Sequence, residues 1–251
     1  MTSSNDSKHS TEGSSSPTDP ALTKLFNDIQ EDFRATKLSP ESWYILVIAC
    51  VVTGPDPELA SKLYLHLCAQ EGYATSEARK TLVRRLREAL VKSVSVIGVC
   101  KPIEAVLAIA EVEREEDRDY GCTREEWQRD GASRERGLDW FRRLYTRNAG
   151  DTIGLFDAHR DFGWISVEIT YGLYLSDRQV LDDVDTEMVV LPAIMMQNLP
   201  KETSWHIRGT RRIGVSLEDT EVVCGCIHKI AKHFGVSLSK VPTVKQIEPE
   251  V

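Results

Sequence analysis

A glutamate and a histidine stand four residues apart in the stretch 201–213, which has the pattern of a helix. At this spacing the side chains of Glu202 and His206 lie on one face of a helix. A carboxylate beside an imidazole raises the imidazole pKa and fixes its tautomer, which suits a general acid–base working near neutral pH. Glu187, on the helix expected before it, could reach the same cleft. The alternative interpretation is a surface ion pair.

A second polar group leads into an apolar segment. His159 and Arg160 precede Trp164 and could supply an imidazole and a guanidinium to a substrate carboxylate. A cap at the start of a helix would explain the same residues. Tyr171 and Arg178 are further candidates for substrate binding in the same cleft.

The six cysteines are expected to be free thiols rather than a disulfide framework. Cys100 lies beside a proline at a helix junction and is a candidate redox thiol. Cys224 and Cys226 resemble a metal motif, but residues two apart on a helix point about 200° apart. We therefore expect buried core cysteines and no metal. The sequence also has no glycine-rich phosphate loop and no zinc helix, so no cofactor is expected.

The composition is that of an ordinary soluble protein. The 251 residues carry a net charge of −8, and 41% are hydrophobic. An acidic chain lacks the basic face that a nucleic-acid partner requires, and no apolar run is long enough for a membrane span. Residues 1–20 are rich in Ser, Thr and Pro and predict a disordered tail. Because this tail has no apolar core and no arginine, a cytoplasmic or nuclear location is expected.

Apolar residues recur at three- and four-residue steps along most of the remaining chain, which indicates an all-α fold. Glu111–Asp119 is a dense charge run that predicts a solvated surface segment. The expected helices cover Leu22–Phe33, Trp43–Val52, Pro57–Gln70, Glu77–Ile97, Ile103–Val112, Ser133–Tyr145, Asp157–Leu175, Asp185–Gln197, Lys201–Ile213 and Ser216–Phe234.

Comparison of the chain with itself predicts two copies of one helical unit. The stretch 88–102 resembles 187–201: an acidic residue opens an apolar helix, which Gly or Asn breaks before Pro and Lys. Leu63-Tyr64-Leu65 recurs upstream as Leu173-Tyr174-Leu175. The predicted division is therefore a tail over 1–20, a first repeat over 21–119, a second repeat over 120–240 and a C-terminal tail over 241–251.

The second repeat resembles the carboxymuconolactone decarboxylase family, whose superfamily also contains the alkylhydroperoxidase D-like proteins. The resemblance rests on Glu187 and on the motifs Gln-Asn-Leu-Pro, Glu-Thr-Ser-Trp-His-Ile-Arg-Gly and Gly-Val-Ser-Leu-Glu-Asp that follow it. It implies an alkylhydroperoxidase D-like helical bundle that forms homo-oligomers, commonly trimers or hexamers. Active sites of this family lie in helical clefts near subunit contacts.

The chain departs from the peroxidase branch of this superfamily, which carries a glutamate, a Cys-x-x-Cys and a histidine. Glu187 and His206 stand at the glutamate and histidine positions, while Leu199 and Glu202 replace the two cysteines. The first repeat keeps only the glutamate and the first cysteine; its four positions hold Glu88, Cys100, Ile103 and Leu107. A dithiol relay needs two thiols, so the decarboxylase branch, which lacks the cysteines, is the better match.

The resemblance and the residues together predict a cofactor-free lyase or isomerase. His206 would move a proton while Glu202 and Glu187 orient it, and the substrate would be a small carboxylated or enolisable molecule whose own lactone or enone accepts the electrons. One alternative is a non-catalytic, oligomeric ligand-binding relative, which a buried His206 without an adjoining pocket would favour. Another is a thiol-dependent peroxidase that uses Cys100.

Overall fold

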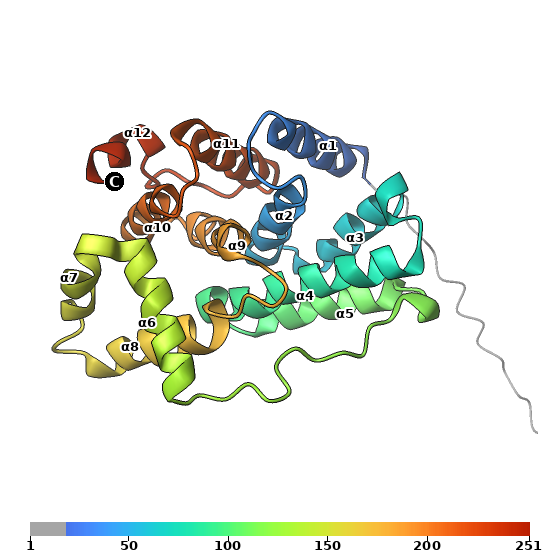
Figure 1. The fold of residues 1–251 in the computed structure, drawn as a ribbon. Coiled ribbons are helices and arrows are strands. Elements are labelled where there is room, and N and C mark those ends of the chain that lie inside the picture. The colour runs from blue at the N-terminus through green and yellow to red at the C-terminus, as the bar shows by residue number, and fades with distance from the viewer. Residues whose placement is uncertain (1–18) are drawn as a thin grey trace, which may run out of the picture.

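The computed structural model describes residues 19–251, and these form helices without any strand (Figure 1). The prediction of an all-α fold is confirmed. Residues 1–18 of the predicted tail lie outside the described residues, and the first helix already begins at Pro20. No helix in the described part of the chain has the length and apolar character needed to span a bilayer.

The order of the elements follows the chain from blue to red in Figure 1. The α-helices are α1 (Pro20–Arg34), α2 (Ser42–Thr53), α3 (Ala60–Cys68), α4 (Ser76–Ile97), α5 (Cys100–Val112), α6 (Gly131–Tyr145), α7 (Ala149–Gly154), α8 (Arg160–Trp164), α9 (Asp183–Met195), α10 (Pro200–Arg212), α11 (Leu217–His233) and α12 (Val244–Ile247). Short 3₁₀ turns are η1 (Pro57–Leu59), η2 (Glu71–Tyr73), η3 (Glu115–Asp117), η4 (Thr146–Asn148) and η6 (Glu248–Glu250), and η5 (Ile165–Leu175) is a π-helix.

The helix ends follow local sequence signals. The hydroxyl of Thr75 caps α4 by accepting the Ala78 amide, and Gly98 ends the helix with a φ of +83°. The hydroxyl of Ser216 caps α11 in the same way, by accepting the Asp219 amide. A capping side chain accepts a hydrogen bond from an amide of the first turn that has no partner within the helix. A glycine in the left-handed region lets the chain change direction at the end of the helix. These local signals explain why the predicted limits of α4 and α11 agree with the structure.

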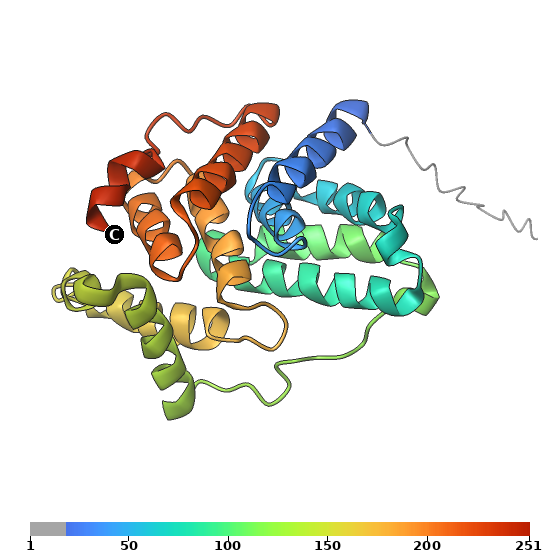
Figure 2. The same cartoon turned by 45° about the horizontal axis from the view of Figure 1, so that its top comes forward.

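Two helices form the centre of the molecule. Every residue of α2 is buried, and α9 is buried from Asp185 to Met195. Figure 2 shows α2 and α9 enclosed by α1, α11, α10 and α4. The main core forms around them. A second, smaller core lies between α6, η5 and α9, and it contains Trp140, Phe141, Leu144, Tyr145, Tyr171, Leu175, Val190 and Ile194.

The smaller core depends on a close approach of α6 and η5. A side chain on Gly137 would place its Cβ 2.6 Å from the backbone nitrogen of Gly172, so only glycine fits here. π-Helices are rare and are frequently found at functional sites. In this protein the π-helix carries Tyr171 into the small core, where it meets Tyr145 of α6.

Two local predictions differ from the structure. The charge run expected at the surface contains Asp117, which is fully buried because Arg79 pairs with it at 2.5 Å. The segment predicted as one helical stretch, 157–175, divides into α8 and the π-helix η5. The particular alkylhydroperoxidase D-like bundle and the division into two repeats stay predictions. In both α4–α5 and α9–α10, however, a helix is followed by a short break and a further helix of 13 residues.

Candidate acid–base site

Helices α9 and α10 bring Glu187 and His206 together in the interior. The Nδ1 atom of His206 lies 2.9 Å from Oε2 of Glu187, and only 7% and 0% of the two side chains are exposed. The connection between the helices turns sharply at Asn198, whose φ of +57° is one that asparagine tolerates better than most residues. The predicted association of Glu187 with His206 is therefore present in the geometry.

The hydrogen bond determines what the imidazole can do. An ionised carboxylate can only accept a hydrogen bond, so Nδ1 carries the proton and donates it to Glu187. A neutral His206 then has Nε2 as its free base, and Nε2 has no hydrogen-bond partner among the described residues. A carboxylate on Nδ1 and a free Nε2 are the arrangement of a general base, because the carboxylate stabilises the imidazolium that forms.

Three further side-chain atoms on these helices are buried without a partner, and two of them belong to residues close to the dyad. The second carboxylate oxygen of Glu187, Oε1, is buried without a hydrogen bond, and so is the hydroxyl of Thr203 one turn before His206. Such atoms are rare in folded proteins because each one costs free energy. At the dyad they leave one acceptor of Glu187 and the hydroxyl of Thr203 without a partner.

A pair of tyrosines lies beside the dyad. The hydroxyl groups of Tyr145 and Tyr171 are 3.0 Å apart, and the Tyr145 ring centroid is 6.4 Å from that of His206. Burial raises the pKa of both phenols well above the usual range. Both hydroxyls therefore remain protonated. Tyr171 was predicted as a site residue; Tyr145 was missed.

Glu202 occupies a different place from the one its spacing suggested. It lies half-buried on α10 and forms no hydrogen bond with His206, whose partner is Glu187. Its charge is close enough to Tyr145 to contribute to the raised pKa of that phenol. The helical i, i+4 pair predicted from sequence is thus replaced by a contact between two helices.

The remaining predicted substrate ligands lie at other contacts. His159 and Arg160 are exposed at the start of α8, and no hydrogen bond or ion pair joins them to the dyad. Arg178 pairs with Asp183, and its guanidinium lies 5.1 Å from the centroid of the Trp140 ring. The structure therefore brings Glu187, His206 and Tyr171 together, but not these three.

All six cysteines are free thiols. Cys100 is exposed at the first residue of α5, whereas Cys224 and Cys226 are buried on α11. Burial raises the pKa of Cys224 to about 12, which makes it a poor nucleophile. Within residues 19–251 no three His, Cys, Asp or Glu side chains converge in a way that could hold a metal ion.

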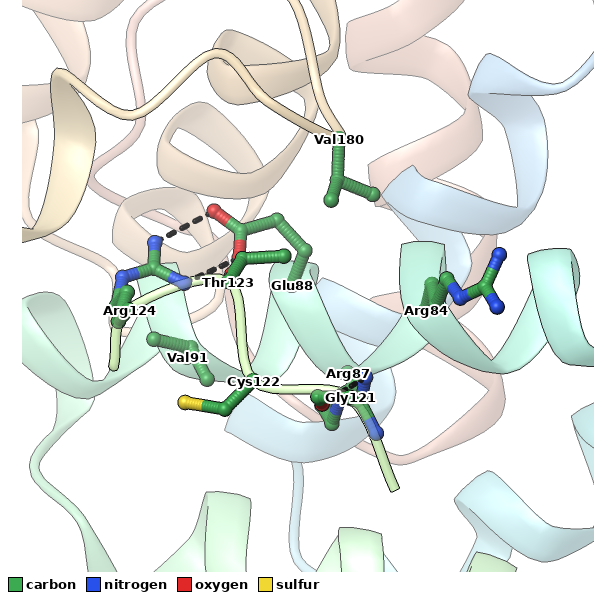
Figure 3. Close-up of a pocket in the computed structure, with 9 residues that line it drawn as sticks. All are labelled: Arg84, Arg87, Glu88, Val91, Gly121, Cys122, Thr123, Arg124 and Val180. Atoms are coloured by element: carbon green, nitrogen blue, oxygen red, sulfur yellow. Dashed lines mark hydrogen bonds and ion pairs between the residues drawn. The ribbon is translucent and has the colours of Figure 1, made fainter. Parts of the chain in front are cut away.

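Glu88, the glutamate of the predicted first repeat, belongs to an ion cluster. Figure 3 shows Glu88 with both carboxylate oxygens on Arg124, at 2.5 and 2.6 Å, at the wall of a cavity of about 180 Å³. Asp177 lies 3.3 Å from the same guanidinium, and the ammonium of Lys92 lies 3.7 Å from Glu88. The thiol at this cavity is Cys122 rather than Cys100. Glu88 is therefore paired with Arg124 and does not form a second copy of the dyad.

Comparison with known proteins adds no further assignment: no family model, curated protein or solved structure matches the chain.

Proposed function

We propose that this protein is a cofactor-free acid–base enzyme, a lyase or isomerase similar to the carboxymuconolactone decarboxylases. The observation that carries the proposal is the buried hydrogen bond from Nδ1 of His206 to Glu187, which leaves Nε2 free. The substrate is a small carboxylated or enolisable molecule. From the sequence features given above, the proposal includes assembly into homo-oligomers and a cytoplasmic location.

The proposed reaction begins with proton transfer to His206. Nε2 takes a proton from the carbon next to the substrate carbonyl, and the electron pair of the broken C–H bond moves into the carbonyl to give an enolate. Glu187 stabilises the imidazolium. The protonated Nε2 then returns the proton to a different carbon, which completes an isomerisation. In a decarboxylation, the bond between carbon and the carboxylate breaks, carbon dioxide leaves, and the electron pair moves into the substrate carbonyl. His206 then starts as the imidazolium, with a proton from water on Nε2, and gives that proton to the carbanion.

The tyrosine pair supports this proposal. An enolate oxygen needs hydrogen-bond donors that keep their protons, and burial holds both hydroxyl groups in that form. One hydroxyl donates to the other across 3.0 Å, so one of the two protons is left over. The hydroxyl that keeps this proton can donate a hydrogen bond to an oxygen of the substrate.

The test is deuterium exchange from solvent into candidate substrates. Small aromatic and lactone carboxylic acids that stabilise the protein in a thermal-shift screen are incubated with it in D₂O and followed by NMR. We expect exchange or carbon dioxide release with the wild type, and a rate at least about 100-fold lower with His206→Gln. His228→Gln, which changes an exposed histidine on α11, is the matched control. Equal rates in wild type and His206→Gln would contradict the proposal.

A non-catalytic, ligand-binding relative is the second candidate, and the burial of both dyad residues favours it. In that case a compound would stabilise wild type and His228→Gln equally and show neither exchange nor decarboxylation. A thiol peroxidase is less well supported, because Leu199 and Glu202 occupy the positions where that branch carries its cysteines.

A further inference from the structure

Three arginines converge on one turn near the end of the described chain. Arg208 and Arg212 project from α10, and Arg147 comes from η4. A guanidinium nitrogen of Arg208 lies 2.5 Å from the carboxylate of Glu250 in η6. Arg147 and Arg212 each donate to the backbone oxygen of Glu250 at 2.9 Å. In Figures 1 and 2 the end of the chain lies beside α10, close to the region of α6 and α7.

The charges in this cluster are unbalanced. Among the described residues, the carboxylate of Glu250 is the only acidic side chain in contact with the three guanidinium groups. Arg147 also donates to an oxygen of Val251 at 3.3 and 3.4 Å. Burial and the charges of Arg208 and Arg147 together lower the pKa of Arg212, and Glu250 opposes this effect. Guanidinium groups held this close repel one another, so the cluster is built to receive negative charge.

Arg208 and Glu250 differ sharply in exposure. Only 9% of the Arg208 side chain is exposed, and its Nε atom is buried without a hydrogen-bond partner. The side chain of Glu250 is 53% exposed. The arginine is therefore a fixed part of the interior with an unused donor, whereas the glutamate reaches it from the surface and can leave.

A neighbouring pair shows what a purely structural contact looks like in this region. Arg211 binds both carboxylate oxygens of Glu248 through two nitrogens, at 2.9 and 2.8 Å. That bidentate pair is the geometry in which a guanidinium and a carboxylate satisfy one another. Glu250 offers Arg208 a single oxygen and leaves Nε unpaired.

We propose that Arg147, Arg208 and Arg212 form a binding site for a small organic carboxylate, and that Glu250 occupies this site as an internal competitor. A planar carboxylate can take the bidentate position on Arg208 that Glu250 does not fill. Arg212 also donates to the backbone oxygen of Tyr145, whose ring lies against His206. The proposal rests on the arginine contacts and stands whether or not the dyad is catalytic.

The experiment compares Glu250→Gln with the wild type in calorimetric titrations with succinate and with benzoate at constant ionic strength. Removing a competitor that fills the site more than nine-tenths of the time strengthens apparent affinity by at least about tenfold. Glu248→Gln is the matched control, because it alters the same turn but a different arginine. We expect it to bind like the wild type. Equal affinities for wild type and Glu250→Gln would overturn the proposal.

A second set of variants locates the site. Adding Arg208→Gln to Glu250→Gln should abolish binding. If the substitution of the buried Arg208 prevents folding, Arg147→Gln, at an exposed residue, replaces it in the same comparison. Arg142→Gln, at another exposed arginine on α6, should leave binding unchanged. Binding that survives both Arg208→Gln and Arg147→Gln would refute the assignment. Equal binding of sulfate would overturn the assignment to carboxylates.

Discussion

One carboxylate oxygen of Glu187 lies 2.9 Å from Nδ1 of His206, while the other is buried without a partner. Among the described residues, the hydrogen bond from His206 is therefore the one interaction that offsets the cost of burying this carboxylate. Burying an ionised group without a partner is costly. This arrangement ties the stability of the protein to the same two residues that the proposed chemistry requires.

His206→Ala should destabilise the fold strongly. It leaves the carboxylate of Glu187 buried with no partner, and breaking a buried pair in this way costs about 3–5 kcal/mol. Equilibrium urea denaturation measures the loss in free energy of unfolding. His228→Ala, at an exposed histidine, should stay within about 0.5 kcal/mol of wild type. A loss below about 1 kcal/mol for His206→Ala would show that water reaches Glu187.

The tyrosine pair should show energetic coupling. Tyr145→Phe and Tyr171→Phe each remove one hydroxyl and leave the other buried alone, which costs about 1–3 kcal/mol. The double variant removes both polar groups, so its loss should be smaller than the sum of the single losses. Urea denaturation of the four proteins completes the cycle. Additive losses would mean that the two hydroxyls do not depend on one another.

Lys92 should make a contribution to the free energy of unfolding that increases with pH above about 8. Burial lowers the pKa of its ammonium to about 8, from a value near 10.5 in the unfolded chain. Between these values the unfolded state binds more protons, so the free energy of unfolding rises with pH and the gain is complete above the unfolded pKa. Lys92→Met should remove this rise, which amounts to a few kcal/mol.

Urea denaturation at pH 7.5, 8.5 and 9.5 tests this expectation. The ammonium also bonds to the carbonyl oxygens of Leu175 and Asp177, so Lys92→Met will change stability at every pH. The informative quantity is therefore the difference in slope between the two proteins. Parallel pH profiles for wild type and Lys92→Met would refute the expectation.

The contact between α6 and η5 should tolerate no side chain at position 137. Gly137→Ala places a methyl group 2.6 Å from the backbone nitrogen of Gly172, and backbone cannot move aside as a flexible side chain can. We expect a loss of about 1–3 kcal/mol or more. Gly150→Ala, in open space on α7, is the control and should be neutral or stabilising. Thermal unfolding followed by circular dichroism compares the two.

The sequence determined the helices more fully than the site. Local signals such as the Thr75 cap and Gly98 specify where α4 begins and ends, so they can be interpreted without tertiary information. The partner of His206 cannot be predicted from local signals. Spacing along one helix favours Glu202, whereas packing between two helices places Glu187 against the imidazole. Glu187 was nonetheless among the predicted residues.

Two features of the site were missed for a related reason. Tyr145 belongs to the site through contacts between elements: its ring lies 6.4 Å from that of His206, and its hydroxyl lies opposite that of Tyr171 on the π-helix. The role of Arg208 depends on the fold of a turn forty residues later. A signal did exist in the second case: three arginines near the end of α10, Arg208, Arg211 and Arg212, outnumber the acidic pair Glu248 and Glu250 by one.

Helix α9 contributes to both cores, since Met188 and Leu191 pack in the larger one and Val190 and Ile194 in the smaller. The ring that lies against His206 belongs to the smaller core, while Glu187 belongs to α9 itself. The two cores can therefore act as separate cooperative units, and opening of the smaller one alone would give a ligand access to His206 while Glu187 stays in place. Native-state hydrogen exchange would then find amides of α6 and η5 exchanging faster than those of α2 and α9.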